Sequence, residues 1–221
     1  MKTLIVMVGT SAIENDDIGR GPNFVDNKNL IAQVKSYKNS RYTQVESNLE
    51  LFDQLVDAHK LFWTAPAAHK ANPRWFRQTS AELISTHYLA QKTRPERVFL
   101  LGSGTNEGWM AAKINASIMR DVWCWEKVHA SRANGLDATM LDVTKRLKTC
   151  IDEEWNLSNE TDVTINFTGG FKGTVAELTL LAASRSWKMC YQHEKSGEAV
   201  LIPLTPTGPG KVEPIWMPNL S

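Results

Sequence analysis

The sequence predicts an α/β fold, a Rossmann-like and mostly parallel sheet flanked by helices, with a C-terminal β-hairpin at the sheet edge. Two segments, residues 97–119 and 162–184, each run from an apolar strand through a glycine-rich turn into a helical pattern. Residues 187–206 read instead as two strands joined by the loop "EKSGE". We expect residues 1–221 to form one domain.

The remaining elements follow from local patterns. Residues 3–8, "TLIVMV", predict a fully buried strand, and the apolar spacing over residues 46–62 predicts a helix. Two prolines make residues 64–78 a loop or lid. The next helix, residues 79–91, opens with a capping-box pattern in which Thr79 or Ser80 precedes Glu82. We expect a further strand over 122–129, a turn over 130–135 and a helix near 137–155.

Composition narrows the function classes. The formal net charge is +1, so no polybasic surface for long nucleic acid is indicated, although a small anionic ligand stays possible. Cys124, Cys150 and Cys190 are far apart and odd in number, which fits reduced packing thiols better than disulfides or a zinc site. We expect no cofactor and no metal.

The N-terminal apolar run "MKTLIVMVGT" is followed at once by the polar stretch "SAIENDD". It is too short for a signal peptide or a membrane span, so we expect a cytoplasmic protein.

Ligands of open parallel sheets bind beyond the carboxyl ends of the strands, where the strand order reverses. Four predicted turns lie at such ends, residues 9–11, 102–105, 129–135 and 169–172. Three of them combine glycine with hydroxyl side chains or a lysine. Because glycine admits close approach and helix N-termini favour anions, these turns indicate a phosphate-bearing ligand.

Each turn also has a plainer interpretation. A glycine after a strand is common, and neither a dinucleotide fingerprint nor a P-loop is present. Lys172 favours function, because a cation at a helix N-terminus opposes the helix dipole unless an anion lies between them. His129 can be a surface or core histidine, and packing is the simpler role for Trp63, Trp75 and Trp109.

Four stretches, "IVMVGTS", "TSAEL", "INFTGGFKG" and "YQHEKSGEAVLIPLTP", occur in the order seen in CARF domains, the CRISPR-associated Rossmann folds of type III CRISPR systems. The chain resembles this family over nearly its whole length, least over residues 12–75. The resemblance implies a homodimer that binds a cyclic oligoadenylate second messenger across its two-fold axis. A two-fold axis suits an even ring, and cyclic tetra-adenylate is the first choice.

Most CARF proteins carry an effector domain, commonly a HEPN ribonuclease, in which His follows Arg at a short spacing. No such pair occurs here, so we expect no effector domain. The chain resembles stand-alone ring nucleases, which cut the messenger and switch the antiviral response off. Such cutting needs no metal, because each ribose 2′-OH can attack the adjacent phosphate and leave a 2′,3′-cyclic phosphate.

The resemblance assigns roles to individual residues. Lys172 neutralises the scissile phosphate, which the turn at Gly169 and Gly170 cradles, while Ser11 orients the ribose or phosphate. Ser11 and Lys172 are thus the expected catalytic residues. The full set of expected ligand-binding residues is Gly9, Thr10, Ser11, Gly102, Ser103, Thr105, Asn106, His129, Arg132, Thr168, Gly169, Gly170, Phe171 and Lys172.

Three functions remain open from the sequence. The chain is a ring nuclease, a CARF sensor that holds the ring uncut and regulates a partner, or an unrelated nucleotide-binding α/β protein. Only the fate of a bound ring separates the first two, because cutting depends on in-line geometry that no motif encodes.

Overall fold

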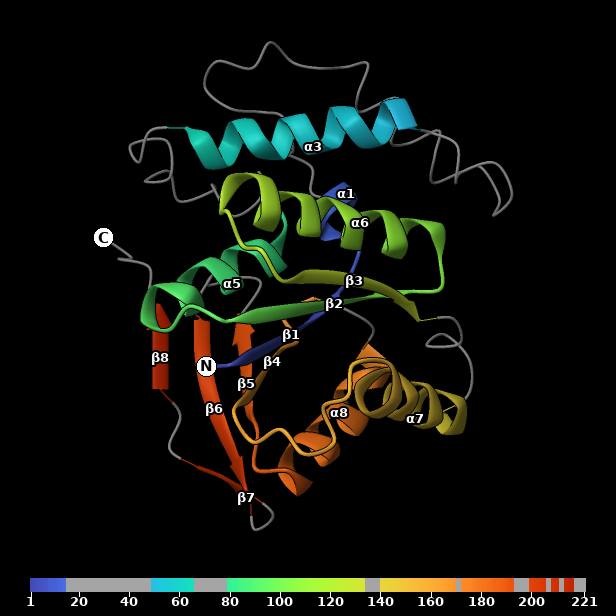
Figure 1. The fold of residues 1–221 in the computed structure, drawn as a ribbon, viewed down its shortest axis with the longest axis vertical. Coiled ribbons are helices and arrows are strands. Elements are labelled where there is room, and N and C mark those ends of the chain that lie inside the picture. The colour runs from blue at the N-terminus through green and yellow to red at the C-terminus, as the bar shows by residue number, and fades with distance from the viewer. Residues whose placement is uncertain are drawn as a thin grey trace.

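A twisted sheet forms the centre of the molecule, with helices on both faces (Figure 1). The structure is a computed structural model, and it describes residues 1–14, 49–65, 79–133, 140–169, 172–192, 199–205, 208–210 and 213–216. The strands are β1 (Thr3–Val8), β2 (Arg97–Ser103), β3 (Val128–Ala133), β4 (Val163–Asn166), β5 (Lys188–Gln192), β6 (Ala199–Thr205), β7 (Gly208–Pro209) and β8 (Glu213–Trp216).

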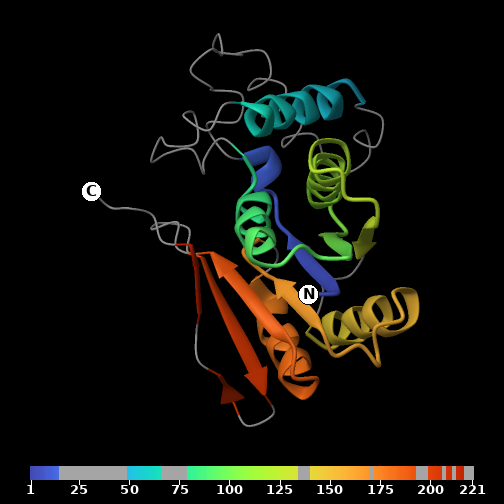
Figure 2. The ribbon, with the colours of Figure 1, turned by 60° about the vertical axis from the view of Figure 1, so that its left-hand side comes forward.

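The strand order is β3-β2-β1-β4-β5-β6-β7. The part of the sheet from β3 through β2, β1 and β4 to β5 is parallel. Strand β6 pairs with β5 in the antiparallel direction. Strand β8 pairs with β6, and Figure 2 shows these C-terminal strands side by side. The predicted Rossmann-like sheet with a C-terminal hairpin is therefore confirmed.

Helices α1 (Ser11–Glu14), α3 (Leu49–Thr64), α5 (Ala81–Lys92) and α6 (Asn106–Ser117) cover one face of the sheet (Figure 1). Helices α7 (Met140–Lys148) and α8 (Lys172–Ser184) cover the other. Two short π-helical segments, η3 (Ile118–Val122) and η4 (Thr149–Glu154), extend α6 and α7. The predicted helices over 46–62, 79–91 and 137–155 correspond to α3, α5 and α7 with η4.

Strand β1 is buried over its whole length, as its unbroken apolar run predicts. Its alternate residues face opposite ways: Leu4 and Val6 join the core under α3 and α6, whereas Ile5 and Met7 join the core over α7 and α8. Each face of the sheet thus has its own apolar core.

The predicted strand over 122–129 is wrong for most of its length. Strand β3 begins only at Val128 and continues through Ala133, across part of the predicted turn. Between η3 and β3 the backbone takes a left-handed conformation at Cys124, and the Trp125 amide donates to the Met119 carbonyl. The rings of Trp123 and Trp125 pack against each other with centroids 5.0 Å apart and planes tilted by 57°, so their alternation reflects packing of a loop.

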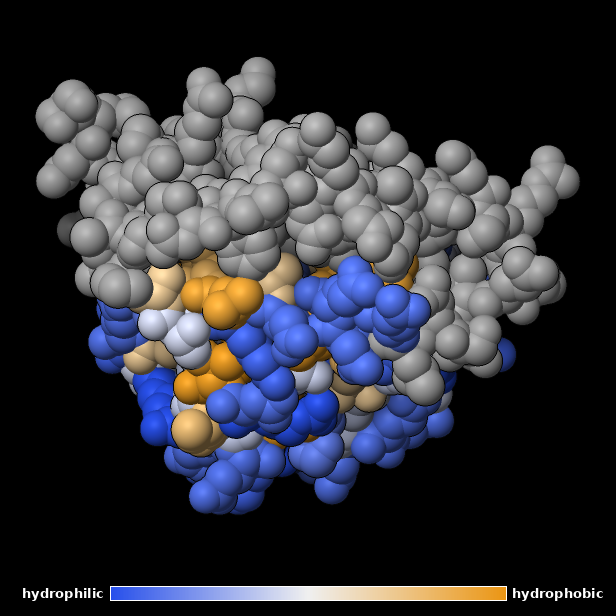
Figure 3. Space-filling view, turned by 90° about the horizontal axis from the view of Figure 1, so that it is seen from above, coloured by the Kyte–Doolittle hydropathy of each residue, from blue (hydrophilic) through white to orange (hydrophobic). Residues whose placement is uncertain are grey.

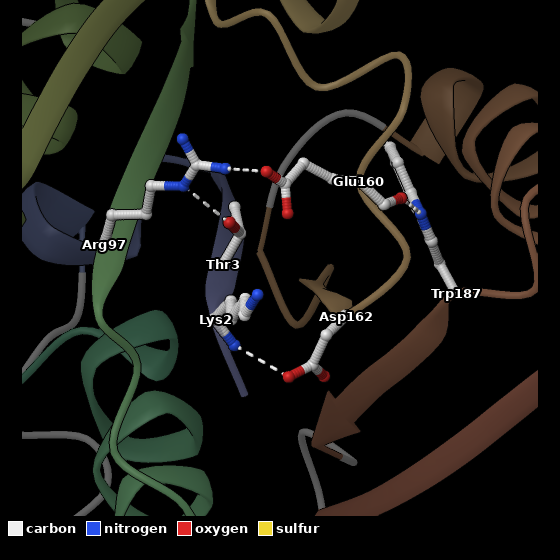
Figure 4. Close-up of polar contacts among 6 residues, drawn as sticks. All are labelled: Lys2, Thr3, Arg97, Glu160, Asp162 and Trp187. Carbon is white, nitrogen blue, oxygen red and sulfur yellow. Dashed lines mark hydrogen bonds and ion pairs between the residues drawn. The ribbon is translucent and has the colours of Figure 1, made fainter.

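Polar contacts join the amino ends of three strands (Figure 4). Arg97, at the start of β2, donates to the Thr3 hydroxyl at 2.8 Å and pairs with Glu160 at 2.7 Å. The Lys2 amide donates to Asp162, just before β4, at 3.0 Å. These contacts hold the end of the sheet opposite the carboxyl ends of the parallel strands.

Cys150 and Cys190 are buried free thiols, and burial raises the pKa of Cys150 to about 11 and that of Cys190 to about 12. Cys124 is free but exposed, so its predicted packing role is wrong.

The view from above, on the side of α3, shows hydrophobic residues scattered among hydrophilic ones on the described surface (Figure 3). Among the helices that the structure describes, none has both the length and the apolar character to cross a membrane.

Candidate functional site

The strand order reverses between β1 and β4. From β1 the chain builds β2 and β3 on one side, then crosses over to build β4 and β5 on the other. Such a switch point leaves a crevice beyond the carboxyl ends of the two central strands. Here those ends carry the turn at Gly9–Ser11 and the turn that includes Thr168 and Gly169, so two of the predicted turns meet at one place.

The carboxylate of Glu82 connects these elements from the first turn of α5. One carboxylate oxygen, Oε1, accepts the Gly9 amide at 2.7 Å, and the other, Oε2, accepts the Ser11 hydroxyl. Oε2 also accepts the Ser80 hydroxyl at 2.8 Å. Glu82 is fully buried, and its place near a helix N-terminus favours a negative charge there.

Gly169 lies directly against this carboxylate. A Cβ atom built on Gly169 would stand 1.7 Å from Glu82 Oε1, closer than any side chain tolerates. The glycine therefore makes room for a carboxylate of the protein itself. The expectation that Gly169 clears space for a ligand phosphate needs this correction, because Glu82 already occupies that space.

The predicted capping box does not form. The N-cap of α5 is Ser80, whose hydroxyl accepts the Leu83 amide at 3.1 Å. Glu82 follows too closely to close a box on Ser80, and its side chain reaches across to Gly9 and Ser11 beyond the end of β1. The "TSAEL" stretch thus serves both the helix start and the site.

Asn166, the last residue of β4, fixes the turn that follows the strand. Its side-chain amide donates to the hydroxyls of Ser85 at 2.8 Å and Thr86 at 2.9 Å, both on α5. Its side-chain oxygen, Oδ1, accepts the Thr168 backbone amide at 3.1 Å. The Thr168 hydroxyl accepts the Gln192 amide of β5 at 2.9 Å, so buried Thr168 is bound into the scaffold.

His59 holds the helix that begins with Ser11. The ring is fully buried, with Nε2 2.9 Å from the Ala12 carbonyl and Nδ1 2.9 Å from the Thr79 hydroxyl. Because a carbonyl only accepts, Nε2 must carry the proton and Nδ1 must accept from Thr79. Burial lowers the pKa of His59 to about 4, outweighing the opposite effect of the bond to Ala12. A neutral imidazole therefore ties α1 to α3 and to the start of α5.

The turn after β2 begins beside the turn after β1, because Gly102 pairs with Val8 in the sheet. Thr105 is the N-cap of α6, and its hydroxyl accepts the Gly108 amide at 3.1 Å and lies 2.8 Å from the Ser103 hydroxyl. A Cβ on Gly102 would stand 2.6 Å from the Gly108 carbonyl, so close strand–helix packing requires this glycine.

Arg132 holds the same turn from β3. Its guanidinium donates to the Gly104 carbonyl from Nε at 3.1 Å and from Nη2 at 2.7 Å. Nη2 also donates to the Asn106 side-chain oxygen at 2.9 Å. Arg132, which lies within β3 and not in the predicted turn at 129–135, and Asn106 therefore meet near the carboxyl ends of β2 and β3, and their contacts stabilise the turn itself.

His129 is not brought to these residues. It is the second residue of β3 and pairs with Phe99, three positions before the turn at Gly102, which is about 10 Å along a strand. Its exposed ring stacks on Phe99 at 5.4 Å. The interpretation of His129 as a group at a carboxyl strand end is wrong, because β3 continues past it.

Thr10 precedes α1, and its carbonyl accepts the Ile13 amide at 2.8 Å. Lys172 is the first residue of α8, the position predicted from the dipole argument. Gly170, Phe171 and the side chain of Lys172 lie outside the described residues, as does most of the expected lid at 64–78.

A protein-family model described as CRISPR-associated protein (Cas_APE2256) matches residues 77–205, which is more than half of the chain. The chain belongs to this CRISPR-associated family. No curated protein matches it.

The match to the Cas_APE2256 family includes Glu82, Asn166 and the turn that leads to Lys172, but it begins after Ser11. Gly9 and Ser11 therefore lie outside the family match, and only the structure supports their place in the site. In the part of the chain that the structure describes, no group of three or more His, Cys, Asp or Glu side chains is arranged to hold a metal ion.

Sequence reasoning missed Glu82, Asn166 and His59 as site-forming residues. Glu82 had a signal, since it lies in one of the stretches quoted for the family resemblance. Asn166 had a weaker one, as a polar residue ending an apolar strand before two glycines. His59 is a single histidine within a helical pattern and carries no signal of its own.

Proposed function

We propose that this protein is a ring nuclease of the CARF type. It binds a cyclic oligoadenylate, first of all cyclic tetra-adenylate, and cuts it without a metal, which switches off type III CRISPR signalling. The observation that carries the proposal is the meeting of the Ser11 turn with the Gly169 turn at the switch point of the sheet. Membership of a CRISPR-associated family supports it.

The reaction is an internal transesterification. A ribose 2′-oxygen attacks the adjacent phosphorus, the bond from phosphorus to the 5′-oxygen breaks, and the products are a 2′,3′-cyclic phosphate and a 5′-hydroxyl. No atom is gained or lost, because the proton that leaves the 2′-oxygen is matched by one that the 5′-oxygen receives. The protein has to hold the 2′-oxygen in line and stabilise the charge on the phosphoryl oxygens.

The two turns suit different halves of this task. Ser11 is partly exposed just beyond the end of β1 and offers its side-chain oxygen to the ribose. Lys172 starts α8, and a cation at a helix N-terminus suits a phosphate. Each protomer of the proposed homodimer supplies one Ser11 and one Lys172 to the ring. The two-fold axis places the second pair at the opposite nucleotide.

The test is to incubate purified protein with cyclic tri-, tetra- and hexa-adenylate in chelator and to follow products by chromatography and mass spectrometry. Linear fragments ending in 2′,3′-cyclic phosphate support the proposal. Tight binding of a ring that stays intact contradicts cleavage and indicates a sensor. Absence of binding to all three rings removes both functions. Light scattering, with and without the ring, measures the proposed dimer.

A further inference from the structure

The hydrogen-bond directions at Ser11 decide what this residue offers to a ligand. Glu82, as a carboxylate, can only accept hydrogen bonds, so the Ser11 hydroxyl donates its proton to Glu82 Oε2. The Ala81 amide donates to Ser11 Oγ at 3.2 Å. A serine oxygen has one proton and two acceptor positions, so these contacts leave one acceptor position.

This arrangement determines which part of the ligand Ser11 can contact. A phosphate oxygen is an acceptor and finds no proton at Ser11, whereas a ribose hydroxyl donates to the remaining acceptor position. The Gly9 amide is also taken by Glu82, at 2.7 Å, so it does not cradle a phosphate. The end of β1 is therefore suited to a hydroxyl group rather than to a phosphate oxygen.

We infer that Glu82 acts through Ser11 as a positioning residue: it orients the Ser11 hydroxyl and takes up the Ser11 proton when Ser11 Oγ receives the proton of the attacking 2′-hydroxyl. This inference rests on the proposed function. The 2′-hydroxyl proton passes to Ser11 Oγ while the Ser11 proton passes to Glu82 Oε2, and the 2′-oxygen bonds to phosphorus. The 5′-oxygen leaves with a proton from solvent, and Glu82 returns its proton to solvent through Ser11.

The burial of the two residues supports this division of roles. Ser11 is partly exposed, whereas Glu82 has no exposed surface, so a ligand reaches the serine and not the carboxylate. Three donors and the backbone of Gly169 hold the carboxylate in place, so Oε2 stays directed at the Ser11 hydroxyl. A proton acceptor within hydrogen-bond reach is the first geometric requirement of acid–base catalysis.

The test compares Glu82→Gln with Glu153→Gln, which makes the same charge change at an exposed position of η4. In Glu82→Gln the amide oxygen faces Gly9, and the NH₂ group faces Ser11 and reverses its hydrogen bond. Single-turnover cleavage is measured with the ring that the wild-type protein cuts best. The Kd is measured for the same ring built from deoxyadenosine, which lacks the attacking hydroxyl.

We expect Glu82→Gln to cut at least about 100-fold more slowly, within the usual range for acid–base groups, while its Kd for the deoxy ring stays within about threefold. Glu153→Gln behaves like wild type. Cleavage by Glu82→Gln within about threefold of wild type overturns the inference, as does a parallel loss of cleavage and deoxy-ring binding.

Wild-type protein alone provides a second measurement, which also applies if Glu82→Gln does not fold. Single-turnover rates in mixtures of H₂O and D₂O give a curved plot when two protons move together, as in the transfer through Ser11. A straight plot overturns the inference and leaves ring cleavage intact. A wild-type protein that cuts no ring removes the proposed function and this inference with it.

Discussion

The Glu82 carboxylate lies where a side chain at Gly169 would have to begin, with Oε1 1.7 Å from the position of a Cβ atom on Gly169. One glycine and one acid, from the end of β4 and the start of α5, thus share a space at the switch point of the sheet. The same carboxylate holds Gly9 and Ser11 at the end of β1. Both turns of the candidate site therefore depend on this contact.

Gly169→Ala tests that contact. The new methyl group forces the Glu82 carboxylate to move, which breaks its bonds to Gly9 and Ser11, so we expect a loss of about 1–3 kcal/mol in the free energy of unfolding and of most ring cleavage. Denaturant unfolding and single-turnover assays measure the two effects. Gly210→Ala is the control, because its nearest neighbour would be 3.4 Å away.

The double variant Gly169→Ala/Glu82→Ala makes this prediction specific. Removing the carboxylate removes the clash, so the destabilisation of the pair should be smaller than the sum of the single variants. Strict additivity would show that the two side chains do not compete for space.

Ser11→Ala removes the proposed acceptor for the ribose hydroxyl. We expect cleavage to fall at least about 100-fold, the effect typical of an acid–base group, with a much smaller change in affinity for the deoxy ring. Ser184→Ala removes a hydroxyl from an exposed site near the end of α8 and serves as the control. Cleavage by Ser11→Ala at the wild-type rate would exclude Ser11 from the reaction.

Lys172→Ala removes the proposed cation at the start of α8. We expect cleavage to weaken at least tenfold, since a donor aimed at the developing charge commonly contributes about 3 kcal/mol. Lys172→Arg should retain more activity than Lys172→Ala because it keeps the charge. Lys188→Ala, an exposed lysine at the start of β5, is the control. An unchanged rate in Lys172→Ala would show that the lysine has another role.

His59 makes the stability of the fold depend on pH. Its pKa is about 4 in the folded protein and 6.5 when exposed, so the unfolded chain binds more protons between these values. Its stabilisation is complete above pH 6.5 and decreases toward pH 4, by about 3 kcal/mol in all. Unfolding of wild type and His59→Gln across this range measures it. Identical pH dependence of the two proteins would contradict the assignment.

The fold was largely predictable because its signals are local. The unbroken apolar run of β1, the two strand–turn–helix segments and the hairpin are each encoded by neighbouring residues. The wrong prediction of a strand over 122–129 also came from a local pattern. Trp123 and Trp125 alternate as in a strand, but they pack from a loop against Trp63 and the core.

The site was only half predictable. Glycine turns at the ends of parallel strands identified the Gly9–Ser11 and Gly169 segments, and the dipole argument identified Lys172 at the start of α8. The interpretation of Ser103, Thr105 and Arg132 as ligand contacts stays a prediction, because their visible contacts stabilise their own turn. His129 was misplaced by an error of a few residues in the limits of β3.

By itself the sequence determined the fold class, the strand-end turns and the resemblance to a CRISPR-associated family, because apolar periodicity, turn chemistry and motifs are written in adjacent residues. Only the tertiary structure decided that Glu82 meets Ser11, 71 positions earlier, and Gly9, 73 positions earlier. Hydrogen bonds between such distant residues arise from the packing of α5 across β1 and β4. That packing made a helix-start glutamate the centre of the candidate site.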